Sequence, residues 1–282
     1  MIADEKDFIT PHITDAHTLD YPCLHSGFVC EYELPRWAPI HIGRFALDIS
    51  PTRHVVMLWI AALLCIVTTL LALRAHNRRT REGRAPSGFG NGLEALVLYL
   101  RNEVVLPNVG AHGNGYVPFL LTLFFFILFA NLLGLVPYGS TATGNISVTA
   151  TLAIVTFFVI ELAGMKAQGK AYINTIIFWP SDMSLGMKLF ISPILTPVEL
   201  IGKVTKPGAL AIRLFANMVS GHVVLLALLS LIFTFGSWLL VPVPLLMATG
   251  IVMLELFVAF LQAFIFTLLS SVFIGLIREG AH

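Results

Sequence analysis

Long apolar runs separated by short polar segments dominate the pattern along most of the chain. Residues 55–73 (VVMLWIAALLCIVTTLLAL) hold no charged side chain. At 1.5 Å per residue, a helix of this length just crosses the roughly 30 Å hydrocarbon core of a bilayer. Residues 116–136 form a second run, with Asn131 in its second half, and residues 146–165 form a third, with Glu161 near its far end. These runs predict three membrane-spanning helices.

Two further apolar tracts, residues 189–235 and 245–277, are separated by Pro242 and Pro244. Proline lacks the amide proton that a helix interior needs, so the pair predicts a hairpin. A helix over residues 189–235 would be on the order of 70 Å long, more than twice the hydrocarbon thickness, so it must tilt, bend or begin on the membrane surface. We expect these last two helices to be long, tilted and antiparallel, with the first lying against something other than lipid.

The stretch LEALVLYLRNEVVL has a different pattern. Its apolar residues recur at three- and four-residue steps, with charged residues away from that stripe, which is typical of an amphipathic helix. We expect a helix over about residues 92–106 lying on the membrane surface, and a spanning helix with three charges is the less favoured alternative. The stripe consists of Leu93, Leu96, Val97, Leu100 and Val104.

The fold class predicted is therefore an all-α polytopic membrane protein with five spans and one surface helix, its membrane domain covering residues 51–282. The composition agrees, since 57% of residues are hydrophobic and 12% charged, against roughly 25% charged in soluble domains. Nothing in the composition suggests a nucleic-acid partner.

Positive charge sets the expected orientation, because Lys and Arg gather in cytoplasmic loops. The segment after the first run carries five arginines against one acid, and the segment after the third run is rich in lysine. With both in the cytoplasm, residues 1–50 are extracytoplasmic and the C-terminus is cytoplasmic. Because the first residues lack the basic start and apolar run of a cleavable secretory signal, we expect the first span to direct insertion.

Cys23 and Cys30 of the N-terminal segment leave three interpretations open. They could form a disulfide on an oxidising side, join histidines of the same segment around a metal, or be unrelated surface residues. The spacing matches no known ligand pattern, so we favour unrelated residues and expect no metal. The histidines concerned are His12, His17 and His25.

Ionisable and amide side chains inside the last two tracts are the candidate functional residues, because such groups are costly at membrane depth. Arg213 and Asn217 are four residues apart, and Glu255 and Gln262 seven apart, so each pair shares one helix face. His222 lies on roughly the opposite side from Arg213. The full set is Glu199, Lys203, Lys206, Arg213, Asn217, His222, Glu255 and Gln262.

A hairpin centred on Pro242 would bring His222 level with Gln262, and a slip of about two turns would bring Glu255 to His222. An imidazole beside a carboxyl group could relay protons near neutral pH.

Structural roles are the alternatives for several of these residues. Asn131, Asn217 and Gln262 taken singly are typical of interhelical hydrogen bonding, and Glu199 with Lys203 forms an ordinary i,i+4 pair. For Arg213 we expect a counter-charge on a neighbouring helix or subunit rather than snorkelling. A further residue, Asp48, is better explained by a helix N-terminal charge than by a channel mouth.

The residues RLFANMVSGH at positions 213–222 closely resemble the core of subunit a of the F-type ATP synthases. LELFVAFLQAFIFTLL resembles the last helix of that family, and KVTKPGALAI resembles the approach to its arginine. The resemblance runs roughly from Pro51 to the end and covers the five-span plan. It implies a stator subunit of a proton-driven rotary motor, in the plasma membrane of a bacterium.

The resemblance also implies roles for individual residues. Arg213 falls on the arginine that faces the ring of c subunits and separates two aqueous half-channels, with Asn217 following it at the family spacing. His222 and Glu255 fall on two interacting positions of the entry channel, where some bacterial members hold an acid and a histidine in the reverse order. Gln262 falls opposite the arginine, and Glu199 belongs to the other channel.

The partners implied are the c-ring, the peripheral stalk subunit b, other F1Fo subunits indirectly and the lipid bilayer. No cofactor and no catalytic site for ATP are expected on this chain. The alternative function is a secondary transporter with a charged site at the midplane, although no duplication of halves is visible. A membrane-embedded hydrolase is weaker still, since neither H-E-x-x-H nor G-x-S-x-G occurs.

Overall fold

A computed structural model gives the fold in two compact units, each built from segments far apart in the sequence. The first unit takes Met1–Leu73, Phe125–Val148 and Leu214–Ala263, and the second takes Arg74–Phe124, Thr149–Arg213 and Phe264–His282. The structure describes residues 15–23, 28–42, 45–48, 50–81, 88–110, 113–136, 139–172, 185–235 and 241–279.

Five helices of the described residues are long and apolar enough to cross a membrane, which confirms the predicted all-α polytopic class. Both final helices are longer than the tracts that predicted them. Their bounds are α2 Arg53–Arg81, α5 Val117–Leu135, α6 Ile146–Gln168, α8 Leu185–Phe235 and α9 Pro242–Glu279.

Two threonines of the first spanning helix form hydrogen bonds within their own helix. In α2, the hydroxyl groups of Thr68 and Thr69 donate to the carbonyl oxygens of Leu64 and Cys65, at 2.6 and 2.7 Å. A threonine inside an apolar helix can bond one turn back in this way, so it adds no unsatisfied group to a segment in hydrocarbon.

The long helix α8 runs without a break through Pro193, Pro197 and Pro207. Prolines inside a helix are places where it can bend, and the described secondary structure stays helical across all three. A proline removes one ladder hydrogen bond at its own position, and in this helix the bonds on either side are enough to keep the α-helical state.

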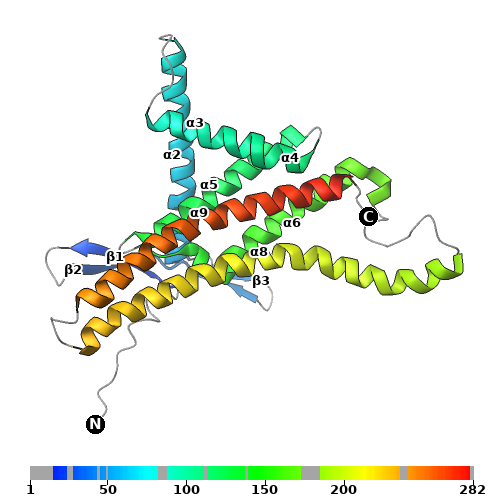
Figure 1. The fold of residues 1–282 in the computed structure, drawn as a ribbon. Helices are drawn as coiled ribbons and strands as arrows, with labels where there is room; N and C mark the ends of the chain where they lie inside the picture. The colour runs from blue at the N-terminus through cyan, green and yellow to red at the C-terminus, as the bar shows by residue number, and fades with distance from the viewer. Residues whose placement is uncertain are drawn as a thin grey trace. The chain divides into compact units, whose positions relative to one another are not determined.

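In the first unit, the end of α8 and the start of α9 run antiparallel, as Figure 1 shows where yellow passes to orange. The helix α8 ends at Phe235 and α9 begins at Pro242, which confirms the hairpin predicted from the proline pair. The buried residues Leu214, Met218 and Ala259 belong to this unit, and Ala259 is completely inaccessible.

The N-terminal part of the first unit contains two small antiparallel hairpins that the sequence analysis did not predict. The strand β1, Thr18–Cys23, pairs with β2, Phe28–Glu33, with Thr18 opposite Glu33, and β3, Ile40–Ile42, pairs with β4, Phe45–Leu47. The backbone N–H of Arg53 donates to the carbonyl of Ala16 at 2.8 Å, so this segment is tied to the start of α2.

Two expectations about this segment are corrected. Cys30 is disulfide-bonded, so the favoured interpretation as an unrelated surface residue is wrong. We expected Asp48 to act as a helix N-terminal charge, but the first turn of α2 contains no acidic residue and Asp48 lies before it. Its side chain instead accepts a hydrogen bond from the N–H of Ser50 at 2.9 Å. Hydrogen bonds from Ser50 lower the pKa of the exposed Asp48 carboxyl. His12 and His25 lie outside the described residues.

The second unit contains the predicted amphipathic helix, extended in both directions. It is assembled from α3, Phe89–Tyr99, a π-helical stretch η1, Leu100–Val105, and α4, Leu106–Val109. The π-helical turn was not predicted. Gly110 follows with φ of 80°, a backbone conformation that side-chain-bearing residues rarely adopt, and the guanidinium of Arg278 donates to the carbonyl of Val109 at 2.7 Å.

Three short 3-10 helices complete the described helical elements, namely η2 Gly113–Tyr116, η3 Ala142–Gly144 and η4 Gly169–Tyr172. The core of the second unit packs the π-helical stretch and α4 against α5, α6 and α9. Its buried residues are Val105, Val109, Val117, Leu120, Ile160, Ala163 and Ile274.

Candidate functional site

The α8–α9 hairpin of the first unit brings Glu255 against Gly221, the residue before His222. A Cβ built on Gly221 would lie 3.0 Å from both Cγ and Cδ of Glu255. Only the missing side chain of glycine lets the Glu255 side chain approach the α8 backbone this closely. The arrangement corresponds to the hairpin slipped by about two turns, with Glu255 beside the His222 turn, and not to the level pairing of His222 with Gln262.

His222 itself is half-buried, and its Nε2 is hydrogen-bonded to the hydroxyl of Thr141. Thr141 lies in the segment 139–145, between α5 and α6. The His222 ring therefore has a neutral hydroxyl group as its hydrogen-bond partner. The residue before it in the chain, Gly221, packs against Glu255.

Glu255 is buried, with 7% of the residue exposed, and neither carboxyl oxygen has a hydrogen-bond partner among the described residues. Burying an ionised carboxylate without a partner costs several kcal/mol or more. A group in such surroundings is a candidate for taking up and releasing a proton, or for meeting a group outside this chain.

Asn131 shows the opposite situation. It is completely buried, donates Nδ2–H to the carbonyl of Ala259 at 3.2 Å, and accepts the Thr143 hydroxyl at 2.7 Å on Oδ1. These bonds join α5, η3 and α9, which supports the helix-packing role that we expected for Asn131. Gln262, seven residues beyond Glu255 on α9, is also buried, with 5% exposed.

Arg213 is exposed on α8, and Asn217, one turn further, is half-exposed. The large apolar side chain of Ile212 beside it is 61% exposed. The small residues Ala209 and Ala216, one helical turn before and after Arg213, are exposed as well. The guanidinium of Arg213 thus stands on a helix surface where the exposed neighbours Ala209, Ile212 and Ala216 are apolar.

In the second unit, Lys203 lies at the centre of a set of charged and aromatic side chains. Its Nζ is 3.5 Å from Oε2 of Glu161, 3.4 Å from the hydroxyl of Tyr172 and 4.8 Å from the centroid of that ring. The expected pairing of Lys203 with Glu199 is therefore replaced by an ion pair with Glu161, on α6. Glu199 is half-exposed on α8.

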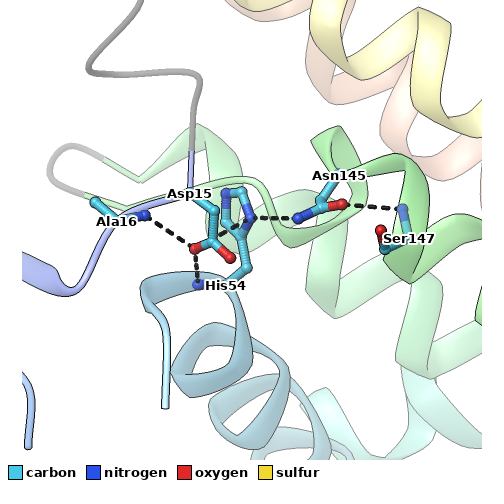
Figure 2. Close-up of polar contacts among 5 residues, drawn as sticks. All are labelled: Asp15, Ala16, His54, Asn145 and Ser147. Carbon is cyan, nitrogen blue, oxygen red and sulfur yellow. Dashed lines mark hydrogen bonds and ion pairs between the residues drawn. The ribbon is translucent and has the colours of Figure 1, made fainter. Parts of the chain in front are cut away.

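A third group of polar residues, missed by the sequence analysis, lies at the start of α2. His54 is buried, and its ring contacts Asp15 and Asn145, as Figure 2 shows. The sequence signal was weak but present, because a histidine follows an arginine at the first turn of a span and an asparagine precedes another span. Both positions are helix starts.

No group of three or more His, Cys, Asp or Glu side chains in the described ranges could hold a metal ion.

Comparison with known proteins adds independent information. Residues 55–275 match the family described as ATP synthase A chain. The chain is 45% identical over 265 residues to ATP synthase subunit a of Chloroherpeton thalassium, which covers 94% of this chain and 74% of that protein.

Two other relatives are similarly close. Over 274 residues, the chain is 46% identical to ATP synthase subunit a 2 of Prosthecochloris aestuarii, covering 96% of this chain and 78% of that protein. Over 280 residues, it is 42% identical to ATP synthase subunit a of Anaeromyxobacter dehalogenans, covering 95% and 70%.

Proposed function

The chain belongs to the ATP synthase A chain family, and from this premise we propose that Arg213 gates proton transfer between two half-channels and a rotating c-ring. The family resemblance inferred from RLFANMVSGH is confirmed by these matches. At the level of the family, the chain is a multi-pass membrane subunit of the Fo sector that takes part in proton transport and ATP synthesis. The match gives no support to the alternative of a secondary transporter.

The observation that carries the gate is the exposed Arg213 on a membrane-length helix. A carboxyl group on a c-ring subunit stays neutral while it faces lipid, because ionising there is costly. Beside a fixed guanidinium the charged form is favoured, so the proton is released. The same positive charge repels a proton that would otherwise pass directly from one half-channel to the other.

The exposed small residues around Arg213 support a partner at this surface. Ala209 and Ala216 leave room for another helix to approach the α8 backbone closely, as small residues do at helix contacts within membranes. We assign this surface to the c-ring. The remaining assembly would include the peripheral stalk subunit b, with other F1Fo subunits contacting the chain indirectly.

The entry path, in this proposal, uses His222 and Glu255, together with Asn217 and Gln262. Its support is the packing of Glu255 on Gly221 and the absence of protein partners for the Glu255 oxygens in the described part of the chain. The exit path uses Glu199. Each charge that crosses a potential of 100 mV yields about 2.3 kcal/mol, which the rotor would convert into rotation.

Orientation follows from the basic segments, which we assign to the cytoplasm, with the N-terminal segment outside. The disulfide at Cys30 supports this assignment, because disulfides persist on the oxidising side of a bacterial plasma membrane.

The test is ATP-driven acidification of inverted membrane vesicles bearing the whole synthase with Arg213→Ala. Assembly is checked by pulling down the ring with this chain. We expect pumping to fall to background in an assembled complex, whereas Arg74→Ala, at an exposed arginine near the end of the first span, should pump normally. Normal pumping by assembled Arg213→Ala would overturn the gate.

A further inference from the structure

The contacts of His54 differ from those of an ordinary buried histidine, because one ring nitrogen faces two partners that require opposite protonation states. Its Nδ1 lies 3.2 Å from Nδ2 of Asn145 and 3.4 Å from Oδ1 of Asp15. An amide nitrogen can only donate to Nδ1, and a carboxylate oxygen can only accept from it. The two hydrogen bonds therefore exclude each other.

The orientation of the Asn145 amide is fixed by a second bond. Its Oδ1 accepts the N–H of Ser147 at 2.9 Å, at the start of α6 (Figure 2). Turning the amide over to offer oxygen to His54 would lose that bond and leave a helix-terminal N–H without its cap. Asn145 consequently favours His54 with an unprotonated Nδ1.

Asp15 favours the other state. Its Oδ1 accepts the backbone N–H groups of Ala16 at 3.1 Å and of His54 at 3.2 Å, so the carboxylate is held in place whether or not the ring is charged. A proton on Nδ1 would turn the 3.4 Å contact into a charge-assisted hydrogen bond. The charges that act on His54 are those of Asp15 and of Arg53, the preceding residue.

The side chains of His54 and Asp15 differ in their exposure to water, which gives proton transfer between them a direction. The His54 side chain is 3% exposed, whereas that of Asp15 is 28% exposed. Asp15 thus connects water with a ring nitrogen that water reaches poorly. The segment that carries Asn145 also carries Thr141, which is hydrogen-bonded to His222. One stretch of seven residues, 139–145, therefore contacts a histidine near each of its ends.

We propose that His54 is the residue at which protons enter the path to His222 and Glu255, with Asn145 the partner of its neutral form and Asp15 the partner of its protonated form. The proposal rests on the proposed function. A hydronium ion gives its proton to the Asp15 carboxylate and becomes water; the new O–H bond then breaks as Nδ1–H forms. The imidazolium then gives its Nδ1 proton to water of the path: the Nδ1–H bond breaks as an O–H bond of hydronium forms, and the unprotonated Nδ1 again accepts the N–H of Asn145.

The test is the rate of ATP synthesis by inverted vesicles at a fixed proton gradient, with the lumenal pH varied across the range in which histidine titrates, about 5 to 8. We expect His54→Gln to slow synthesis about tenfold and to flatten this pH profile, a smaller loss than the roughly hundredfold or more that general acid–base groups contribute in catalysis. His41→Gln changes another, exposed histidine of the N-terminal segment and should leave the rate and the profile unchanged.

A second variant covers the case in which His54→Gln does not assemble. Asp15→Asn keeps an oxygen for the two backbone N–H groups but removes the charge that favours protonated His54, so its profile should move toward lower pH with assembly intact. A wild-type profile in assembled His54→Gln, or in Asp15→Asn, would overturn the proposal. If Arg213→Ala still abolishes pumping in that case, the gate stands and only the entry residue is wrong.

Discussion

The two units each contain a buried polar group of residues, and the two groups differ in how well they are satisfied. In the first unit the polar cluster consists of Asn131, Thr141, Thr143, His222 and Glu255. In the second unit the lysine cluster consists of Glu161, Tyr172 and Lys203. Every charged group of the lysine cluster has an opposite charge or a dipole beside it, whereas the buried Glu255 carboxyl has no protein hydrogen bond among the described residues.

This difference distinguishes buried polar groups with a structural role from those with a functional role. A buried charge that is paired and hydrogen-bonded has its desolvation cost offset and can stay in one state. A buried carboxyl that lacks such partners is costly when ionised, so its retention needs another explanation. We propose that proton transfer, as part of the family function, supplies that explanation for Glu255. The lysine cluster is explained by packing alone, even though it holds more formal charge.

The largest effect that would sharpen the comparison is expected at Glu255. Glu255→Gln keeps the shape of the side chain but cannot exchange a proton, and Glu255→Leu removes the polar group altogether. We expect both to slow ATP-driven pumping on the order of a hundredfold in complexes that still contain the ring. Glu103→Gln, at an exposed glutamate of η1, is the control and should pump normally. Unchanged pumping by Glu255→Leu would remove Glu255 from the path and make the polar cluster as structural as the lysine cluster.

An intermediate effect is expected at Gly221. In Gly221→Ala the new Cβ would overlap the Glu255 carboxyl group and come within 3.0 Å of its Cγ and Cδ, so the carboxyl must move away from the His222 turn. Overpacking of this kind costs about 2 kcal/mol, and we expect pumping to fall about fivefold if half of that cost reaches the transfer step. Measured pumping by an assembled variant is the readout.

The control for this substitution lies on the same helix. Gly208 has no atom within 4 Å of the position that a Cβ would occupy, so Gly208→Ala adds the same methyl group without a collision and should pump normally. Equal rates for the two variants would show that the approach of Glu255 to Gly221 does not matter for transport.

The helices were predictable because uninterrupted apolar runs in a chain of this composition have few other uses. The sequence also predicted which residues to examine on α8 and α9. It did not predict their pairing. A hairpin centred on Pro242 brings Gln262 to His222, but α8 already ends at Phe235, so the pairing is centred earlier and brings Glu255 there instead. Pro242 is the first residue of α9, a position where proline is tolerated.

Contacts between distant segments account for the remaining misses. The ion pair of Glu161 with Lys203 joins α6 to α8, and helical spacing within α8 could only suggest Glu199 as the partner. His54 became a candidate only when Asp15 and Asn145, far from it in the sequence, were found beside its ring. The periodicity of apolar residues and the spacing of polar residues each describe a single helix or strand. They therefore cannot give the tertiary partners of polar side chains.

The smallest effect on transport is expected in the lysine cluster. Variants of this cluster also test whether it differs in function from the polar cluster of the first unit. The side chains of Lys203 and Glu161 are 9% and 15% exposed, so Lys203→Met should leave a mostly buried carboxylate without its partner and destabilise the complex by about 3 kcal/mol. In the double variant Lys203→Met with Glu161→Gln both charges are gone, and most of that stability should return. A double-mutant cycle on thermal unfolding of the purified synthase measures the coupling between Lys203 and Glu161.

ATP-driven pumping by these variants should stay near normal wherever the complex assembles, because we expect this ion pair to stabilise the fold and not to exchange protons. If the double variant is stable but does not pump, the lysine cluster belongs to a proton path too, and satisfaction of buried charge no longer distinguishes structural from functional groups in this protein.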